Sequence, residues 1–250
     1  MNPLVLVEKK GDMWVLTLNR PDKLNAMSSD LVEKLQSAVD QAHEQGARLL
    51  VFKGAGKSFC AGFDLSNLQE SSEADLLLRF VRIELLLQSV AHSPCLTLAL
   101  AHGKVFGAGV DLFAACKERV TSEDAVFRMP GLKFGLVLGT RRFAEIVGKE
   151  RARNLLELTS SFGCSQALEM GFAHACVGVN EWSEVIGSAK ERSIVLDQPT
   201  QTNLYKLLGT QDTEKDADLS SVVRSAVRAG LKERLLNYVN GQSSNKSLNN

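Results

Sequence analysis

Hydrophobic positions follow strand and helix spacing through the first half of the chain and predict an α/β fold. Two β-prone apolar runs, 4–8 and 14–18, flank a Lys-Gly-Asp turn and predict a hairpin. Leu31, Leu35 and Val39 keep helical spacing after the capping serines at 28 and 29. Buried strands are predicted at 48–52 and 95–101, separated by a long apolar helix over 73–90. This alternation favours parallel strand pairing.

The second half of the chain is mostly helical by pattern. Ser165 is placed to cap a short helix over 166–170, and a late strand is expected at 175–179. Beyond residue 181 the pattern predicts helices only. The stretch 219–239 carries one apolar stripe and predicts a single terminal helix that buries this stripe on the core or on a neighbouring subunit.

Charge and composition exclude several classes of protein. The chain has 29 basic and 29 acidic residues among 250, whereas nucleic-acid binders usually carry a basic excess; Lys9-Lys10 and Arg151–Arg153 are too sparse to suggest RNA binding. No apolar run reaches the roughly 18 residues of a membrane span, and we expect no secretory signal, because no basic stretch precedes an apolar core at Met1–Leu4. The five cysteines contain no CxxC pair, so we expect buried, reduced thiols, no metal site and a cytoplasmic protein without membrane or nucleic-acid partners.

Two glycine-rich segments, 54–65 and 103–112, each follow a predicted strand. Small residues there let backbone N–H groups point into a crevice, and a helix N-terminus adds positive potential. Taken singly, each segment is also typical of a plain tight turn. Neither is a nucleotide-binding loop, because Leu112 occupies the last glycine position of G-x-G-x-x-G and Val51 the first of the P-loop. Together they predict two N–H groups aimed at one developing oxyanion.

The combination of these segments with two earlier motifs resembles the crotonase, or enoyl-CoA hydratase/isomerase, superfamily. The motifs are Asn19-Arg20-Pro21, Leu24-Asn25-Ala26-Met27, Gly54–Leu65 with its A-G-x-D-L block, and Gly103–Leu112. The resemblance spans about Val7 to Val179. It implies a spiral of repeated β-β-α units, a crotonase-like core over 1–190, and a C-terminal helical oligomerisation region over 191–250 that builds homotrimers or dimers of trimers.

The resemblance also implies a ligand and its site. Family members bind acyl-CoA thioesters and stabilise a thioester enolate, with coenzyme A as part of the substrate and no separate cofactor. By motif position, the oxyanion donors fall on the N–H groups of Ala61 and Ala108. The residues predicted to contact substrate or CoA are Lys23, Leu24, Ala26, Lys57, Phe59, Gly62, Phe63, Asp64, Leu65, Gly107, Gly131 and Leu136. For the two lysines, a solvated surface role is the alternative.

Two departures from the family pattern bear on the reaction. The first family glutamate is Asp111 here, and the second, after a proline, is Gly131. A two-carboxylate hydration is therefore doubtful, whereas isomerisation needs one base, for which Asp111 is the candidate; a helix N-terminal role is its alternative. Apolar residues 136–138 are predicted to line the acyl pocket, and Arg141 is a candidate for a substrate carboxylate or for a surface or subunit-interface role.

The resulting prediction is an acyl-CoA-processing enzyme of the hydratase/isomerase type, a lyase or isomerase of fatty acid metabolism. The alternatives are a catalytically impaired homologue that binds CoA esters, and an acyl-CoA decarboxylase or thioesterase on the same fold. His92 and His102 are the histidines nearest the predicted site in the sequence. A role at a helix C-terminus and a structural role, respectively, are favoured over catalysis.

Overall fold

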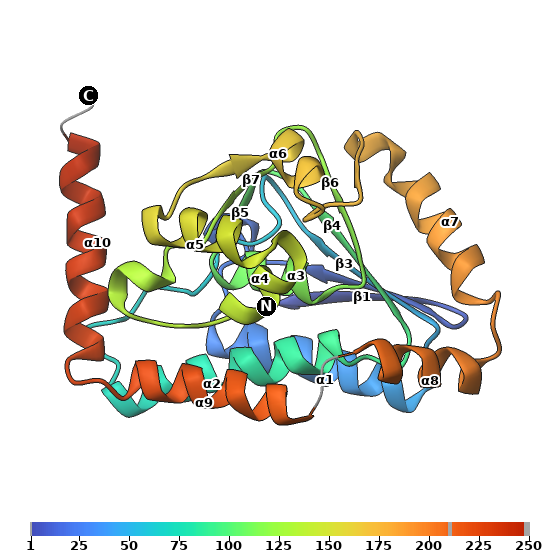
Figure 1. The fold of residues 1–250 in the computed structure, drawn as a ribbon, viewed down its shortest axis with the longest axis horizontal. Coiled ribbons are helices and arrows are strands. Elements are labelled where there is room, and N and C mark those ends of the chain that lie inside the picture. The colour runs from blue at the N-terminus through green and yellow to red at the C-terminus, as the bar shows by residue number, and fades with distance from the viewer. Residues whose placement is uncertain (1, 210–211, 248–250) are drawn as a thin grey trace.

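The computed structural model describes residues 2–209 and 212–247, with side chains through residue 241, and contains a twisted six-stranded sheet at its centre (Figure 1). Its strands, in spatial order, are β1 (Val5–Lys10), β2 (Met13–Leu18), β3 (Leu49–Gly54), β4 (Leu96–Ala101), β6 (Glu118–Thr121) and β9 (Ala175–Cys176). The hairpin β1–β2 is antiparallel and every later pair is parallel. The predicted hairpin and the predicted parallel pairing are both confirmed.

A second sheet of three short strands lies over the end of β3. It consists of β5 (Lys104–Phe106), β7 (Val126–Arg128) and β8 (Phe162–Gly163). Isolated bridges from Ser58 to Gly103 and from Cys60 to Val105 tie the loop after β3 to this sheet. The second glycine-rich segment therefore contains a strand, which the sequence did not predict, and this strand brings the two glycine-rich segments together.

The helices cover both faces of the large sheet. They are α1 (Ser29–Glu44), α2 (Glu73–Ala91), α3 (Ala108–Ala115), α4 (Thr140–Val147), α5 (Lys149–Leu158), α6 (Cys164–Glu169), α7 (Trp182–Ser193), α8 (Gln198–Leu208), α9 (Asp212–Ala226) and α10 (Leu231–Ser247), with 3₁₀ turns η1 (Pro21–Lys23), η2 (Gly131–Phe134) and η3 (Val179–Glu181). Figure 1 shows α1, α2 and α9 on one side of the sheet and α7 on the other. In the described ranges, no helix combines the length and hydropathy needed to cross a bilayer.

Alternation along the strands divides the core between these two faces. Leu50 and Phe52 of β3 point into the larger cluster, which includes α1, α2 and α3, whereas Leu49 and Val51 point toward α7. Both faces of the parallel strands are thus buried, as is usual for parallel sheets. The apolar helix α2 lies between α1 and α9, in agreement with its hydrophobic character on nearly all sides.

The single terminal helix predicted over 219–239 is wrong, because the structure contains two helices there. Helix α9 ends at Ala226, and α10 begins at Leu231 after Gly230, whose φ of +75° is left-handed. The apolar stripe nevertheless stays together: Val222 and Leu235 pack in one cluster with α2 and η2. The domain boundary expected after residue 190 falls inside α7. The N-cap of α6 is Gly163, whereas Ser165 was predicted.

The cysteines only partly match the expectation of reduced, buried thiols. Cys60, Cys95 and Cys116 are free and buried. Cys164 and Cys176 form a disulfide, with their Cα atoms 6.3 Å apart, a separation within the usual range for such bonds. The sequence spacing contains no signal for this pair, because the contact arises only when α6 folds back against β9.

Candidate active site

A mostly apolar pocket lies where the loop after β3, the start of α3, η2, α2 and α10 meet. Its cavity volume is about 150 Å³. The lining residues are Ala61, Gly62, Phe63, Leu65, Phe80, Phe106, Gly107, Ala108, Asp111, Met129, Pro130, Gly131, Leu132, Phe134, Leu136, Leu138, Thr140, Leu156 and Tyr238. Nine of the residues predicted from the sequence as oxyanion donors, acid/base or substrate contacts are among them: Ala61, Gly62, Phe63, Leu65, Gly107, Ala108, Asp111, Gly131 and Leu136.

Polar side chains from the first motifs hold the loop over this pocket. The buried Asn25 donates from Nδ2 to the carbonyl oxygens of Ala55 and Ser58, at 2.8 and 2.7 Å. Arg20 forms an ion pair with Asp64 at 2.8 Å. Burial raises the pKa of Asp64, but hydrogen bonds from Ser66 and Arg20 outweigh this and leave it below its ordinary value. The motif residues thus hold the loop in place. Asp64 stabilises the loop through its ion pair with Arg20 and does not line the pocket.

The N–H groups of this loop have different partners, and this corrects one predicted donor. The Ala61 N–H donates to the Leu24 carbonyl oxygen at 2.9 Å, so it is engaged within the protein. The Gly62 N–H points to Cys60 Sγ at 3.4 Å. In the described part of the chain, the Phe63 N–H has no acceptor. The prediction of Ala61 as an oxyanion donor is therefore wrong, and Phe63, which lines the same pocket, has the unengaged amide.

The second glycine-rich segment presents the N-terminus of α3 to the pocket. Ala108 is the first residue of this fully buried helix, and the first N–H groups of a helix have no intrahelical acceptor. Among the described residues, the Ala108 N–H has no other acceptor. Gly62 lies directly beside it: a Cβ on Gly62 would be 3.5 Å from the Ala108 nitrogen and would overlap the Phe106 carbonyl. The two segments therefore converge on one pocket.

Asp111 is the one carboxylic acid on the wall of this pocket in the described residues. Asp111 is 3% exposed, and its Oδ1 has no hydrogen-bond partner within the described part of the chain. Burial raises the pKa of Asp111 well above its ordinary value; Arg142 opposes this rise and Glu84 adds to it. A carboxyl group in this state suits proton transfer near neutral pH.

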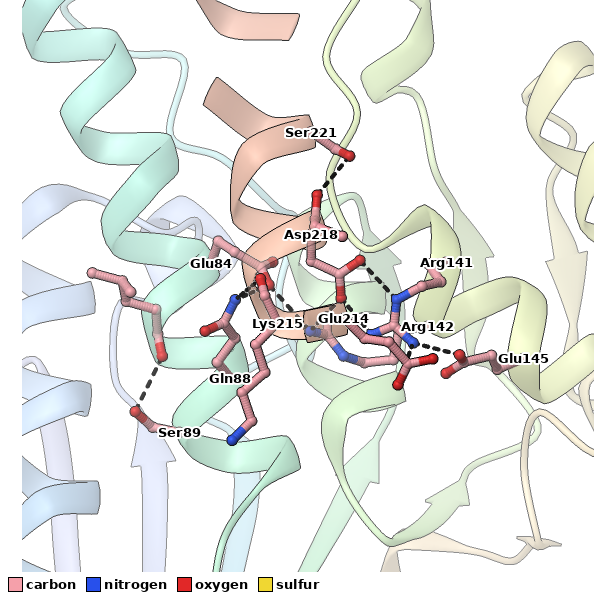
Figure 2. Close-up of polar contacts among 12 residues, drawn as sticks. Glu84, Gln88, Ser89, Arg141, Arg142, Glu145, Glu214, Lys215, Asp218 and Ser221 are labelled. Carbon is pink, nitrogen blue, oxygen red and sulfur yellow. Dashed lines mark hydrogen bonds and ion pairs between the residues drawn. The ribbon is translucent and has the colours of Figure 1, made fainter. Parts of the chain in front are cut away.

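A buried ionic network lies behind the pocket and joins α2, α4 and α9 (Figure 2). The guanidinium of Arg142 donates to Glu84 Oε1 at 3.2 Å and lies 3.8 Å from Asp218 Oδ2. Arg141 donates two hydrogen bonds to Asp218, at 2.9 and 2.6 Å, and one to Glu145. Arg141 does not line the pocket, so the structure gives it a helix-to-helix role in place of the suggested contact with a substrate carboxylate.

Six predicted contact residues lie outside the pocket wall. Lys23 and Lys57 are exposed on the surface, and Leu24 and Ala26 contribute carbonyl oxygens that hold the loop. Phe59 is fully buried in the core against Phe113, so its prediction as a ligand contact is wrong. Asp64, the sixth, is paired with Arg20 as described above.

The two histidines lie away from the pocket. His92 caps the C-terminus of α2, where burial and the nearby Lys215 lower its pKa to about 4. It is therefore neutral at pH 7 and adds no positive charge to the helix end. His102 lies 2.9 Å from the Gly56 carbonyl oxygen through Nε2 and packs edge-on against Trp182. Its role is structural, as the sequence favoured.

Sequence reasoning missed the distal wall of the pocket. Phe80 comes from α2, Phe134 from η2 and Tyr238 from α10, and none belongs to a motif. The all-round apolar character of α2 is the one signal for Phe80. Leu136 and Leu138 line the pocket as predicted, but Val137 does not, and its N–H is bound to Ser225.

Comparison with known proteins identifies the family of this chain. The profile of the enoyl-CoA hydratase/isomerase family matches residues 8–199. A probable enoyl-CoA hydratase of Mycobacterium leprae is 35% identical over 197 residues, covering 74% of this chain and 78% of that protein. A short-chain-enoyl-CoA hydratase of Clostridium acetobutylicum is 29% identical, covering 88% and 86%.

Solved structures show the same relationship. A crystal structure of a protein of Bordetella parapertussis, described as an enoyl-CoA hydratase/isomerase, superposes with a TM-score of 0.93 at 49% identity, covering 95% of this chain and 99% of that one. An enoyl-CoA hydratase of Bacillus halodurans has a TM-score of 0.83 at 21% identity, covering 94% and 100%, and shows the fold alone. The chain belongs to the enoyl-CoA hydratase/isomerase family, and its fold is the crotonase fold.

Proposed function

We propose that this protein binds an acyl-CoA thioester, stabilises its enolate with the N–H groups of Phe63 and Ala108, and moves a proton with Asp111. One observation carries the proposal. Asp111 is the one carboxylic acid on the wall of a pocket that two main-chain N–H groups without acceptors also line, in the described residues. Such groups are the parts that enolate chemistry requires.

The backbone donors act on the thioester carbonyl. As the α-proton leaves, negative charge grows on the carbonyl oxygen, and fixed N–H dipoles in a dry pocket stabilise it without reorganising. The N-terminus of α3 adds its positive potential at Ala108. Loss of one such donor typically costs about 10²–10³ in rate.

Asp111 takes and returns the proton. Burial disfavours the ionised form of Asp111 and so raises its pKa. A carboxylate with a raised pKa is a stronger base for removing a proton near neutral pH. The same residue can remove a proton from one carbon and deliver it to another, so double-bond isomerisation is complete with one carboxyl group. Gly131, at the position of the second family glutamate, lies on the pocket wall without a side chain, and this disfavours a two-carboxylate hydration.

For the assembly, the homotrimer or dimer of trimers implied by the family resemblance is part of the same proposal. Support comes from apolar side chains left exposed on and beside α8: Val195, Leu207 and Leu208 are 76%, 79% and 77% exposed. Large apolar surfaces of this kind mark association sites. Light scattering after size exclusion gives a mass of three or six chains if this is right, and a monomer mass contradicts it.

The function is tested by deuterium exchange at the α-carbon of saturated and unsaturated acyl-CoAs, followed by mass spectrometry. We expect exchange with the wild type and a loss of about 10³-fold in Asp111→Asn, the effect typical of removing a general base. Isomerisation of a 3-enoyl-CoA should be lost in parallel. Binding of CoA esters without exchange across the panel would favour the impaired homologue, and turnover that survives in Asp111→Asn would remove Asp111 from the mechanism.

A further inference from the structure

The distal half of the pocket is closed by aromatic rings from α2, η2, α10 and the loop after β3. Phe63 stacks on Phe80, with ring centroids 4.2 Å apart and planes 20° from parallel. Phe134 packs against Tyr238 of α10, with centroids 5.1 Å apart. Phe80 is 1% and Phe134 7% exposed, so these rings are held in the protein interior. The pocket therefore ends at a wall rather than in an open channel.

The cavity in front of this wall is small. Its volume is about 150 Å³, and an apolar cavity of about this size accepts a molecule such as benzene. A saturated chain of twelve carbons needs about twice that space, because its carbon count is about double that of benzene. It could enter only if Tyr238 or Phe134 moved.

The wall also lacks charge. Among the described residues that line the pocket, Asp111 and no other carries a titratable charge near neutral pH, and no lysine, arginine or histidine is present. Arg79 does not line the pocket; its guanidinium lies over the Phe63 ring at 4.1 Å and donates to the Asp64 carbonyl oxygen at 2.6 Å. An acyl group with a terminal carboxylate would lose its hydration here without gaining a cationic partner, at a large cost.

We infer that the substrate is the CoA ester of a compact, uncharged, apolar acyl group of about six carbons, and that Phe134 and Tyr238 set this limit. The inference rests on the proposed function, because it takes the pocket to be the acyl site. It adds a substrate class and two specificity-determining residues that lie outside the family motifs.

Calorimetric titration of the full-length protein with non-reacting saturated esters tests the size limit. We expect hexanoyl-CoA to bind about tenfold more tightly than dodecanoyl-CoA, since an overlong chain must displace packed rings. For charge, succinyl-CoA is compared with 4-methylpentanoyl-CoA, which has the same branched shape with two methyl groups in place of the carboxylate oxygens. We expect the charged ester to bind about 100-fold more weakly.

Two variants test whether Tyr238 and Phe134 set the limit on acyl chain length. Tyr238→Ala and Phe134→Ala should each improve dodecanoyl-CoA binding about tenfold relative to hexanoyl-CoA, because each removes part of the wall. Tyr205→Ala is the matched control, since it truncates the same side chain on α8, outside the pocket wall, and should leave the ratio unchanged. Thermal unfolding of each variant verifies that it is folded.

The outcomes separate the two claims. If wild-type protein binds dodecanoyl-CoA as tightly as hexanoyl-CoA, or succinyl-CoA as tightly as its neutral isostere, the substrate class is wrong while the proposed function stands. An unchanged length preference in both wall variants removes Phe134 and Tyr238 as its determinants. If no ester binds more tightly than free CoA, the pocket is not an acyl site and the proposed function itself fails.

Discussion

The carboxyl group of Asp111 packs directly against Cα of Gly139, the residue that caps α4. A Cβ on Gly139 would overlap Oδ1 of Asp111, and the φ of Gly139, +65°, is itself in the left-handed region. The contact holds the buried carboxyl group on the pocket wall, where Oδ1 has no hydrogen-bond partner among the described residues. It also makes α4, and not only α3, responsible for the position of the proposed base.

Gly139→Ala should therefore displace Asp111. We expect the α-proton exchange rate to fall about 10²-fold, the size of effect that a misplacement of about 1 Å produces. Gly148→Ala is the control, because Gly148 also has a positive φ, +87°, but no atom of the described residues lies within 4 Å of an added Cβ. Both variants should lose about 1–3 kcal/mol of stability from backbone strain, and equal loss of exchange in both would show that the Asp111 contact is not what matters.

Asp111→Asn should make the folded protein more stable at neutral pH. Burial raises the pKa of Asp111 in the folded protein above its value in the unfolded chain. Below the unfolded pKa both states hold the proton, and Asp111 costs no stability. As pH rises from the unfolded pKa through the folded pKa, the unfolded chain ionises more readily, and the free energy of unfolding falls. Replacing the acid with an amide removes that loss. We expect a gain of about 1–3 kcal/mol at pH 8, the scale of a buried group without a partner.

Urea unfolding at several pH values measures this effect. Between the ordinary pKa of an aspartate and the raised one, the wild type should lose stability relative to Asp111→Asn, and above that range the difference should be constant. Two parallel stability curves from pH 4 to pH 8 would mean that the carboxyl group titrates normally and is not held in a dry site.

The motifs were sufficient to predict the fold and half of the site. Asn25 and Arg20 belong to the motifs and hold the loop over the pocket. The motif positions therefore locate the pocket entrance in the sequence. The donor assignment failed at Ala61, because a hydrogen bond to Leu24 is a tertiary contact that a motif position does not encode. Side-chain motifs say which turn is present, but not which of three consecutive N–H groups remains unengaged.

The distal wall of the pocket and the ionic network could not be predicted from the sequence for a related reason. Tyr238 reaches the pocket because the chain breaks at Gly230 and α10 turns back toward η2. Arg141 pairs with Asp218, 77 residues away, and this separation gives no periodic signal. In both cases the relevant contact joins the helical region to the core, and such contacts depend on tertiary packing rather than on local pattern.

The disulfide between Cys164 and Cys176 predicts a thiol count of three. Unfolded, unreduced protein should react with three equivalents of a thiol reagent and reduced protein with five. The pair of substitutions Cys164→Ser and Cys176→Ser should lower stability by about 2–4 kcal/mol. Neither cysteine lines the pocket, so exchange activity should stay unchanged; five reactive thiols before reduction would contradict the bond.

The pair Arg142 and Glu84 should tune Asp111 in opposite directions. Both are buried, at 7% and 0% exposure, and their charges act on the pKa of Asp111 with opposite signs. Without the Arg142 cation, the ionised form of Asp111 loses its stabilising charge, so its pKa rises and α-proton exchange should begin at higher pH. Without the Glu84 anion, that pKa falls and exchange should begin at lower pH.

The variants Arg142→Met and Glu84→Gln test this through the pH dependence of α-proton exchange. Loss of structure alone would not shift this pH dependence in opposite directions in the two variants. Arg142→Met leaves Glu84 buried without its cation and should cost about 3–5 kcal/mol, whereas the double variant should recover part of this. Arg82→Met is the surface control, because Arg82 pairs with Glu33 in exposed positions and should shift neither stability nor profile appreciably. Shifts of the same sign in both single variants would show that the network acts on the fold rather than on Asp111.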